Sequence, residues 1–166
     1  MNVLKIALVA IAACAVSSSS FAASQRIDLI TDHKPGTIII HTKERRLMFV
    51  LDDGTALKYP IAVGREGAQW TGETHVTHMR WRPEWRPTPS MRQKNPNLPA
   101  VVPPGPSNPL GVAAIYLAQD LLRIHGTSDP KSIGKAASSG CFRMYNEDVL
   151  ELYQLVEPDA TVIVKG

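Results

Sequence analysis

Residues 121–149 read LLRIHGTSDPKSIGKAASSGCFRMYNEDV, and the rest of the chain is best interpreted outward from this stretch. Its first residues form an apolar, strand-like run that ends on His125 and opens onto a loop rich in Gly, Ser and Pro. Cys141 lies at the far end of that loop, directly after two serines and a glycine. If Cys141 to Arg143 is extended, these two side chains share one face and Phe142 points to the core. The stretch therefore predicts His125 at a strand end and Cys141 with Arg143 on one side of a second extended segment.

The residues that follow predict a helix. Asn146 has the residue type of a helix N-cap, and Glu147 and Asp148 are acidic residues in the first turn, where the helix dipole favours negative charge. Apolar residues then recur at helical spacing as far as about Val156. One amphipathic helix is therefore expected shortly after Cys141.

The rest of the chain predicts mainly β structure. β-Branched and alternating apolar runs separated by turn residues are typical of strands. Strands are expected at residues 37–41, 46–51, 57–63, 74–81, 112–118, 121–125 and 161–164. Pro60 interrupts the third run, which places it at a sheet edge or bulge. The predicted fold class is mainly β with a single good helix.

Residues 83–109 differ in composition from the strands around them. They contain nine of the chain's thirteen prolines. Because proline fixes φ and donates no backbone hydrogen bond, this segment is expected to form neither a helix nor a central strand. Long irregular segments within a domain are commonly functional. We interpret it as a large ordered loop that acts as a lid over the site, with a floppy insertion as the alternative.

The first 22 residues have the pattern of a secretory signal peptide. Lys5 supplies a positive charge, residues 6–16 are apolar, and Ser20 and Ala22 are small residues at the −3 and −1 cleavage positions. The apolar run is too short to span a membrane, which needs roughly 20 residues. A lipoprotein signal at Cys14 is the alternative. The expected organisation is a signal peptide (1–22), a short linker (23–36) and one domain (37–166).

Composition narrows the class of protein. The chain has 166 residues, which suits one domain, and a formal net charge of +3 that falls to +2 when a leader containing Lys5 is removed. This weakly favours an acidic partner, whereas the dispersed Arg and Lys residues do not form a nucleic-acid-binding pattern. Without Cys14, Cys141 is the sole cysteine, so no internal disulfide can form and its thiol is a candidate reactive group.

Cys141 and His125 are the residue types that acyl transfer needs. A thiol is a weak nucleophile at neutral pH until a base or a cation favours the thiolate. An imidazole within hydrogen-bond reach can take the thiol proton and later return it to a leaving amine. The alternatives are a structural cysteine and histidine, or a zinc site that adds His75 and His78, which lacks CxxC or HExxH spacing. These residues alone predict a cysteine hydrolase or acyltransferase.

The neighbours of Cys141 suit the other tasks of the same chemistry. Free backbone amides at Gly140 and Cys141 can stabilise an oxyanion. Arg143 can hold a substrate carboxylate through two parallel hydrogen bonds. The hydroxyls of Ser138 and Ser139 can orient either partner. The candidate site therefore extends over the whole run that ends at Arg143.

These residues closely resemble the YkuD-type L,D-transpeptidase catalytic domain, which carries His-Gly-Thr, then Ser/Thr-x-Gly-Cys, then Arg. The resemblance extends to YPIAVGREGAQWTGET (59–74), RPEWRPTPSM (82–91) and PPGPSNPLGVAAIYL (103–117). It covers roughly residues 37–166. It implies a β-sandwich with one helix after the cysteine and a long Pro-rich loop.

The resemblance also implies roles for the residues that match its motif. Cys141 corresponds to the nucleophile, His125 to the base, and Gly126 to the position whose carbonyl orients the histidine. No metal and no organic cofactor is implied.

Four further positions belong to the same motif. Ser138 matches the signature hydroxyl, while Gly140 and Arg143 match the oxyanion and substrate-binding end. Ser139 departs from the pattern, because many members have a second histidine there. This departure leaves substrate preference open.

The reaction implied by the resemblance takes place on peptidoglycan stem peptides. The predicted signal peptide implies export to the periplasm, and neither a nucleic-acid partner nor a membrane span is expected from the composition and hydropathy of the chain. The thiolate attacks the carbonyl after the L-centre of the third residue of a tetrapeptide stem and expels the terminal D-alanine. An amine then takes the acyl group. This acceptor amine belongs to a second stem (which gives a 3–3 crosslink), to an outer-membrane lipoprotein lysine or to a free D-amino acid. The alternatives are an L,D-carboxypeptidase, which uses water, and a non-catalytic wall-binding protein.

Overall fold

One long strand, β6 (Gly72–Trp81), organises the sheet. In the computed structural model, which describes residues 24–119 and 121–166, the first half of β6 pairs with β11 and the second half with β7. The register shifts between Val76 and His78. A bulge of this kind bends the strand and increases its twist. The sheet therefore changes direction at β6, and its two halves face each other as a sandwich.

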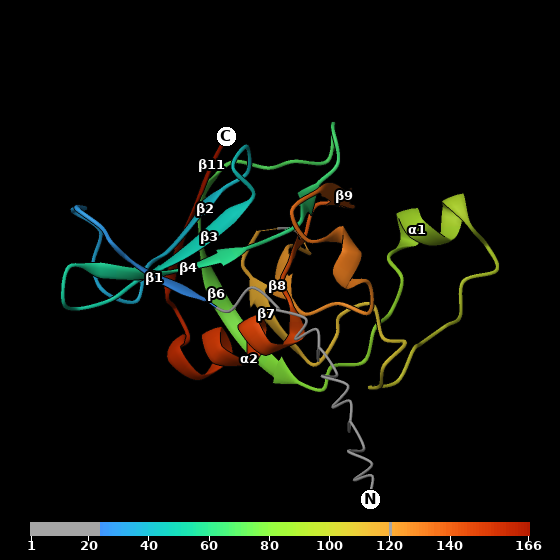
Figure 1. Cartoon of the computed structure of the whole chain (residues 1–166). Coiled ribbons are helices and arrows are strands. Elements are labelled where there is room, and N and C mark those ends of the chain that lie inside the picture. The colour runs from blue at the N-terminus through green and yellow to red at the C-terminus, as the bar shows by residue number, and fades with distance from the viewer. Residues whose placement is uncertain (1–23, 120) are drawn as a thin grey trace, which may run out of the picture.

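Nine strands form this sheet in the order β1-β4-β3-β2-β11-β6-β7-β8-β10 (Figure 1). The other strands are β1 Gln25–Asp28, β2 Ile38–His41, β3 Arg46–Val50, β4 Thr55–Pro60, β7 Ala113–Leu117, β8 Arg123–His125, β10 Phe142–Arg143 and β11 Thr161–Lys165. A separate pair joins β5 (Val63–Gly64) to β9 (Ala136–Ser138). The predicted mainly β class and sandwich are confirmed.

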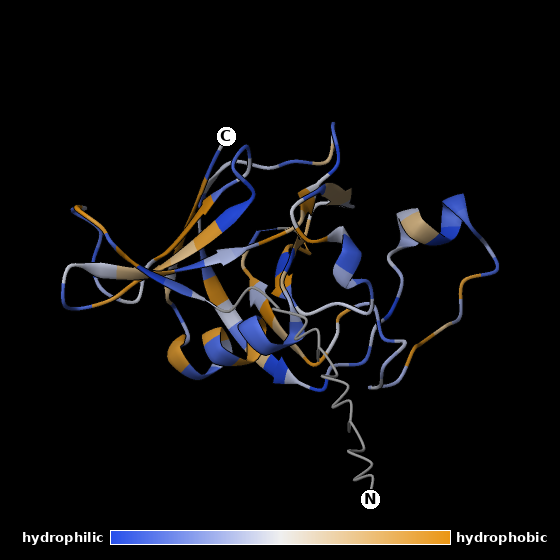
Figure 2. Cartoon of the chain, in the orientation of Figure 1, coloured by the Kyte–Doolittle hydropathy of each residue, from blue (hydrophilic) through white to orange (hydrophobic). Residues whose placement is uncertain are grey.

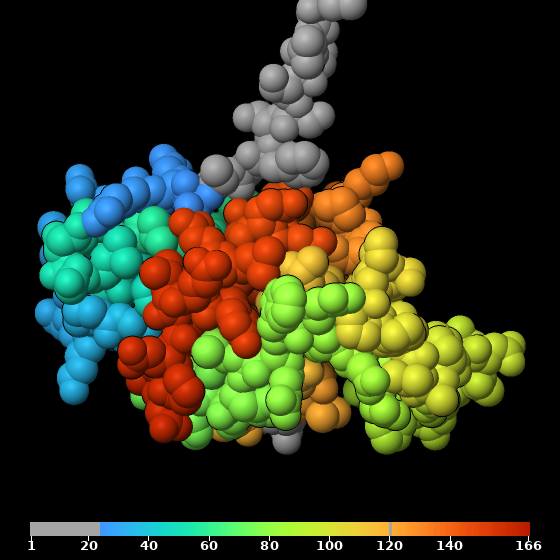
Figure 3. All heavy atoms as spheres, turned by 90° about the horizontal axis from the view of Figure 1, so that it is seen from below, coloured from blue at the N-terminus to red at the C-terminus, as the bar shows by residue number. Residues whose placement is uncertain are grey.

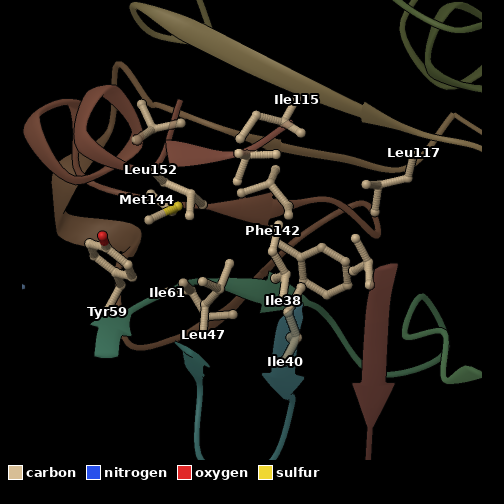
Figure 4. Packing of buried hydrophobic residues seen from close by; sticks show 14 of the residues in the cluster. Ile38, Ile40, Leu47, Tyr59, Ile61, Ile115, Leu117, Phe142, Met144 and Leu152 are labelled. Atoms are coloured by element: carbon tan, nitrogen blue, oxygen red, sulfur yellow. The ribbon is translucent and has the colours of Figure 1, made fainter. Parts of the chain in front are cut away.

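The core lies between the two halves of the sheet (Figure 4). Ile38, Leu47 and Ile61 approach it from one side, and Ile115 and Phe142 approach it from the other, all 0–1% exposed. Burying an aliphatic or aromatic side chain of this size contributes about 1.5–3 kcal/mol. The β8–β10 edge is therefore anchored to the rest of the domain by its apolar residues, which leaves its other face for polar ones.

Helix α2 (Asn146–Leu155) covers the sheet beside β7 and β8 (Figure 1). Figure 2 shows that it alternates between hydrophobic and hydrophilic residues, and Val149 and Leu152 on its inner side are fully buried. The predicted N-cap is off by one residue, because Tyr145 is the cap and Asn146 is the first helical residue. The Asn146 side chain is engaged elsewhere, as described below.

The Pro-rich segment contains a helix, α1 (Pro89–Lys94), where none was predicted. Thr88 caps it by accepting a hydrogen bond from the Met91 amide at 3.3 Å, and Pro89 occupies the first turn, where its missing N–H costs nothing. The buried Asn108 side chain donates to the Pro83 carbonyl at 2.8 Å and so closes the base of the segment. Figure 3 shows the segment, coloured lime to yellow, as a lobe projecting from one side of the body.

Other predicted elements differ in detail from those in the structure. The expected polar linker contains β1, which pairs with β4. Pro60 ends β4 beyond its last pair with β1, so its missing N–H breaks no ladder on that side. A short 3-10 turn, Pro130–Ser132, lies in the loop before Cys141. The predicted signal peptide and the alternative lipidation at Cys14 lie outside the described residues.

Candidate active site

Strands β8 and β10 bring the two ends of the predicted site together. They pair in parallel, with Arg143 opposite His125 and Phe142 opposite Ile124. Because opposite residues in a ladder point to the same face, Arg143 and His125 share one face. Phe142 and Ile124 point to the core, where they are 1% and 0% exposed. The extended segment predicted after Cys141 is confirmed.

His125 is held as a neutral imidazole in a dry environment. It is 5% exposed, and its Nδ1 lies 2.6 Å from the carbonyl oxygen of Gly126. A carbonyl only accepts, so Nδ1 carries the proton and Nε2 keeps a free lone pair. Burial lowers the pKa of His125 to about 4, opposed by the Gly126 hydrogen bond and helped by the charges of Arg143 and Arg123. The side chain is therefore uncharged at neutral pH.

The Asn146 side chain fixes the backbone at the end of β8. Its Oδ1 accepts from the amides of Thr127 (3.0 Å) and Val112 (3.4 Å), and its Nδ2 donates to the Thr127 carbonyl at 3.1 Å. A Cβ built on Gly111 or Gly126 would lie only 2.2 or 2.3 Å from Oδ1. Glycine is therefore required at both positions. Sequence reasoning gave Asn146 a capping role and missed this one.

Cys141 lies between β9 and β10 and is partly exposed. Its Sγ donates a weak hydrogen bond to the Leu121 carbonyl, 3.6 Å away. Leu121 is 60% exposed and has a positive φ of 55°. In the described part of the chain no hydrogen bond joins Sγ to His125. The structure thus places Cys141 directly before β10, the strand that pairs with the strand of His125, without forming the predicted thiol–imidazole contact.

Ser138 holds the turn that precedes the thiol. It is 2% exposed, and its hydroxyl donates to the Cys141 carbonyl at 2.6 Å while accepting from the Gly140 amide at 3.0 Å. The Gly140 amide is therefore not free, contrary to the prediction, whereas the Cys141 amide has no acceptor among the described residues. Gly140 has a φ of +132°, a backbone conformation that residues other than glycine rarely adopt.

Ser139 points outward, in contrast to Ser138. Its hydroxyl accepts a hydrogen bond from Nη1 of Arg65 at 3.3 Å, and the Arg65 amide donates to the Ser138 carbonyl at 3.0 Å. Arg65 follows β5, more than seventy residues before Ser139 in the sequence. Sequence reasoning did not single out Arg65, although it lies in the stretch 59–74 that carries part of the family resemblance.

A cleft of about 580 Å³ opens beside Cys141. It is lined by Arg65, Glu66, Gly67, Ala68, Thr88, Ser90, Met91, Lys94, Leu121, Leu122, Arg123, Ser139 and Cys141. Helix α1 and its cap thus supply one wall, at the position where a lid was expected. Three cations and one carboxylate line the cleft, which favours an anionic ligand. His125, Gly126, Gly140 and Arg143 are not among its lining residues.

Arg123 is a second cleft residue that sequence reasoning missed. Its guanidinium lies 5.0 Å from the centre of the Tyr116 ring, and its Nη1 donates to the Leu121 carbonyl at 2.9 Å. That carbonyl is the one that also accepts from Cys141. An arginine inside an otherwise apolar strand was the signal that could have identified it.

The zinc alternative gains no support from side-chain positions. Across residues 24–119 and 121–166, no three His, Cys, Asp or Glu side chains come close enough to hold a metal ion. His78 instead stacks on Tyr116, with ring centres 4.2 Å apart. Within the same residues, no helix is both long enough and apolar enough to cross a bilayer.

Known proteins are similar to this chain in sequence and fold. The YkuD L,D-transpeptidase catalytic domain matches residues 35–164. Probable L,D-transpeptidase ErfK/SrfK of Escherichia coli K12 is 36% identical over 128 residues, which are 72% of this chain and 40% of that protein. The chain therefore spans less than half the length of this relative.

Two solved structures extend the comparison. L,D-transpeptidase 3 from Mycobacterium tuberculosis has a TM-score of 0.61 at 14% identity, covering 78% of this chain and 60% of that one, which shows likeness of fold. A Brucella melitensis protein named a probable carnitine operon oxidoreductase is 41% identical, with a TM-score of 0.58, over 85% of this chain and 91% of that one.

Proposed function

Since this chain belongs to the YkuD L,D-transpeptidase catalytic domain family, we propose that it is a peptidoglycan L,D-transpeptidase with Cys141 as nucleophile. The observation that carries the proposal is the neutral, buried His125 on the strand beside the one that begins after Cys141. A neutral imidazole that can accept one proton, near a partly exposed thiol, suits acyl transfer.

The first step transfers one acyl group to sulfur. Cys141 Sγ turns away from the Leu121 carbonyl and gives its proton to Nε2 of His125. The thiolate attacks the carbonyl carbon after the third residue of a tetrapeptide stem. The C–N bond to the terminal D-alanine breaks, and its amine leaves with the proton from His125. The product is a thioester and free D-alanine.

Fixed polar groups support this step. The Gly126 carbonyl keeps the proton of the neutral imidazole on Nδ1, so that Nε2 can act as the base. The Cys141 amide is the donor available to the developing oxyanion, since Ser138 occupies the Gly140 amide. Arg143 shares the face of His125 and adds positive charge there. The tetrahedral intermediate is thus stabilised by groups already in position.

The second step releases the acyl group to an acceptor. An amine of a second stem gives a 3–3 crosslink, a lipoprotein lysine gives an attached lipoprotein, and water gives the L,D-carboxypeptidase product. In each case the acceptor loses a proton to His125, the C–S bond breaks, and the thiol is restored. Export to the periplasm, as the predicted signal peptide implies, would bring the enzyme to this substrate.

The test is incubation of tetrapeptide muropeptides with the protein lacking residues 1–22, wild type beside Cys141→Ala, followed by mass spectrometry. We expect loss of D-alanine with wild type and none with the variant, whose thermal unfolding should match. Crosslinked dimers or shortened monomers distinguish transfer from hydrolysis. Equal turnover by both proteins would exclude Cys141 as nucleophile, and binding to sacculi without turnover would indicate a wall-binding role.

A further inference from the structure

A separate cleft of about 420 Å³ lies where β3 begins and β4 ends. Arg45, Arg46 and Lys58 line it together with Glu44 and Gln25. It shares no lining residue with the cleft of Cys141, and the function proposed above gives it no role. We call it the Arg46 cleft.

The sheet places a row of basic side chains at this cleft. Strands β11, β2, β3 and β4 lie side by side (Figure 1). Lys165 of β11 is opposite His41 of β2, and His41 is opposite Arg46 of β3. Because residues opposite one another in a ladder point to the same face, these three side chains form one line across the strands. Lys58 lies on that face too, since it is opposite Met48, two residues along β3 from Arg46.

The rest of the chain does not neutralise the cations of the cleft. Among the residues that the structure describes, the side chains of Arg45, Arg46 and Lys58 form no salt bridge. Glu44 is the one carboxylate in the lining, and its Oε2 lies 3.6 Å from Nδ1 of His41. The cleft therefore carries a positive charge that nothing in it balances.

His41 responds to this charge. Burial lowers the pKa of His41, the charges of Arg46 and Lys165 lower it further, and Glu44 opposes them. Neighbouring cations disfavour a further positive charge. The row thus resists a cation and favours an anion.

Two details of the arginines indicate a ligand rather than a solvated surface. The Nε of Arg46 is buried and has no acceptor in the described part of the chain. Such a donor is destabilising until an acceptor is supplied. Arg45 has a positive φ of 51°, which glycine would adopt without strain, and its carbonyl accepts from the Ile61 amide at 2.9 Å.

We propose that the Arg46 cleft binds a phosphomonoester group, carried either by a membrane lipid or by a soluble molecule. Such a group has a charge of about −1.5 to −2 at pH 7 and three acceptor oxygens. A carboxylate has a single charge and would leave most of the row unbalanced. The guanidinium groups of Arg45 and Arg46 donate to the phosphate oxygens, and Lys58 adds a point charge. Binding here needs no reaction at Cys141, so the site goes beyond the proposed function.

The test measures binding of glycerol 3-phosphate by calorimetry, with acetate as the carboxylate probe and glycerol as the uncharged probe. We expect saturable binding of glycerol 3-phosphate alone, weakened by added salt. Arg46→Ala with Lys58→Ala should raise its Kd about tenfold or more, because charge-assisted contacts are lost. The matched control, Lys34→Ala with Lys131→Ala, removes the same charge at exposed positions outside the cleft and should leave the Kd unchanged.

Vesicles distinguish the two sources of phosphate. Phosphatidylcholine vesicles are prepared with phosphatidic acid, a phosphomonoester, or with the diester phosphatidylglycerol. Sedimentation of wild type with the phosphatidic acid vesicles, and loss of it in the Arg46/Lys58 variant, would assign the group to a lipid. Binding of glycerol 3-phosphate without sedimentation would assign it to a soluble molecule.

A measurement on wild type keeps the inference testable even where the double variant unfolds. The backbone amide signals of Arg45 and Arg46 should shift on addition of glycerol 3-phosphate. Equal affinity for acetate, an unchanged Kd in the folded double variant, or shifts confined to Arg80 and Arg82 would each overturn the site. The double variant should release D-alanine at the wild-type rate, so failure of this inference and failure of the proposed function can be told apart.

Discussion

His125 ends β8 and Cys141 directly precedes the neighbouring strand β10, yet the surroundings of the two side chains differ in burial and in hydrogen bonding. His125 is 5% exposed, and its Nδ1 lies 2.6 Å from the carbonyl oxygen of Gly126. Its own carbonyl accepts a hydrogen bond from the Met144 amide at 2.8 Å. Cys141 is partly exposed, and its thiol makes one weak contact to a carbonyl in an exposed, positive-φ residue. The base is fixed before substrate arrives, whereas the nucleophile is free to turn.

This difference has a physical logic. A general base works best when its tautomer and orientation are set in advance, because reorienting it during the reaction adds to the barrier. A nucleophile that forms and then breaks a covalent bond benefits from access to the cleft. Rigidity is therefore concentrated around His125 and access around Cys141.

The largest expected effect comes from removing the fixed base. His125→Gln should lower the rate of D-alanine release by about 10³-fold, since general base catalysis contributes 10²–10⁴-fold. His75→Gln, at an exposed position on β6, is the matched control and should retain full activity. Release rates and thermal unfolding of all three proteins check this. A residual rate within tenfold of wild type would assign the base to another group.

The same residue predicts a pH dependence of stability. The folded pKa of His125, about 4, lies below the unfolded value of 6.5, so the unfolded chain binds a proton that the folded chain rejects. Stability should therefore fall as pH drops from 6.5 to 4, by on the order of 3 kcal/mol, and His125→Gln should lack this component. Urea unfolding across this range measures it. Parallel curves for the two proteins would contradict a buried neutral His125.

A smaller effect is expected from loosening the support of the base. Asn146→Ala leaves the Thr127 and Val112 amides without their acceptor and should cost about 2 kcal/mol of unfolding free energy. Activity should fall about 10–100-fold even where the protein is folded, with a shift in the acid limb of the pH–rate profile. Asn146→Asp keeps the acceptor and should recover part of both. Loss of stability with an unchanged profile would reduce Asn146 to a purely structural residue.

The smallest effects are expected beside the thiol, where two adjacent serines differ in burial, Ser138 being buried and Ser139 exposed. Ser138→Ala removes the contacts to Cys141 and Gly140 and should cost about 1–2 kcal/mol together with several-fold in rate. Ser139→Ala loses one exposed contact to Arg65 and should change either quantity by less than about twofold or 0.5 kcal/mol. Urea unfolding and D-alanine release compare the pair. Equal effects would contradict the division between a fixed and an adaptable side.

Much of the fold was predictable from local pattern. The runs at 37–41, 46–51, 74–81, 112–118 and 161–164 all contain strands, because alternating and β-branched residues on a half-buried surface leave few other solutions. The helix at Pro89 was not predicted, because nine prolines in residues 83–109 argue against helical structure there. Thr88 followed by Pro89 is nevertheless a helix-start pattern, with an N-cap residue before a proline in the first turn.

The sequence by itself determined which residue types meet the needs of acyl transfer: a cysteine after Gly140, a histidine at a strand end and an arginine two residues past the thiol. Only the tertiary structure decided that Arg143 lies opposite His125, that Asn146 braces Thr127, and that Ser138 occupies the Gly140 amide. It also decided that Arg123 lines the cleft of Cys141. The reason is that strand register and hydrogen-bond partners depend on residues far apart in the chain, whereas residue type and local periodicity do not.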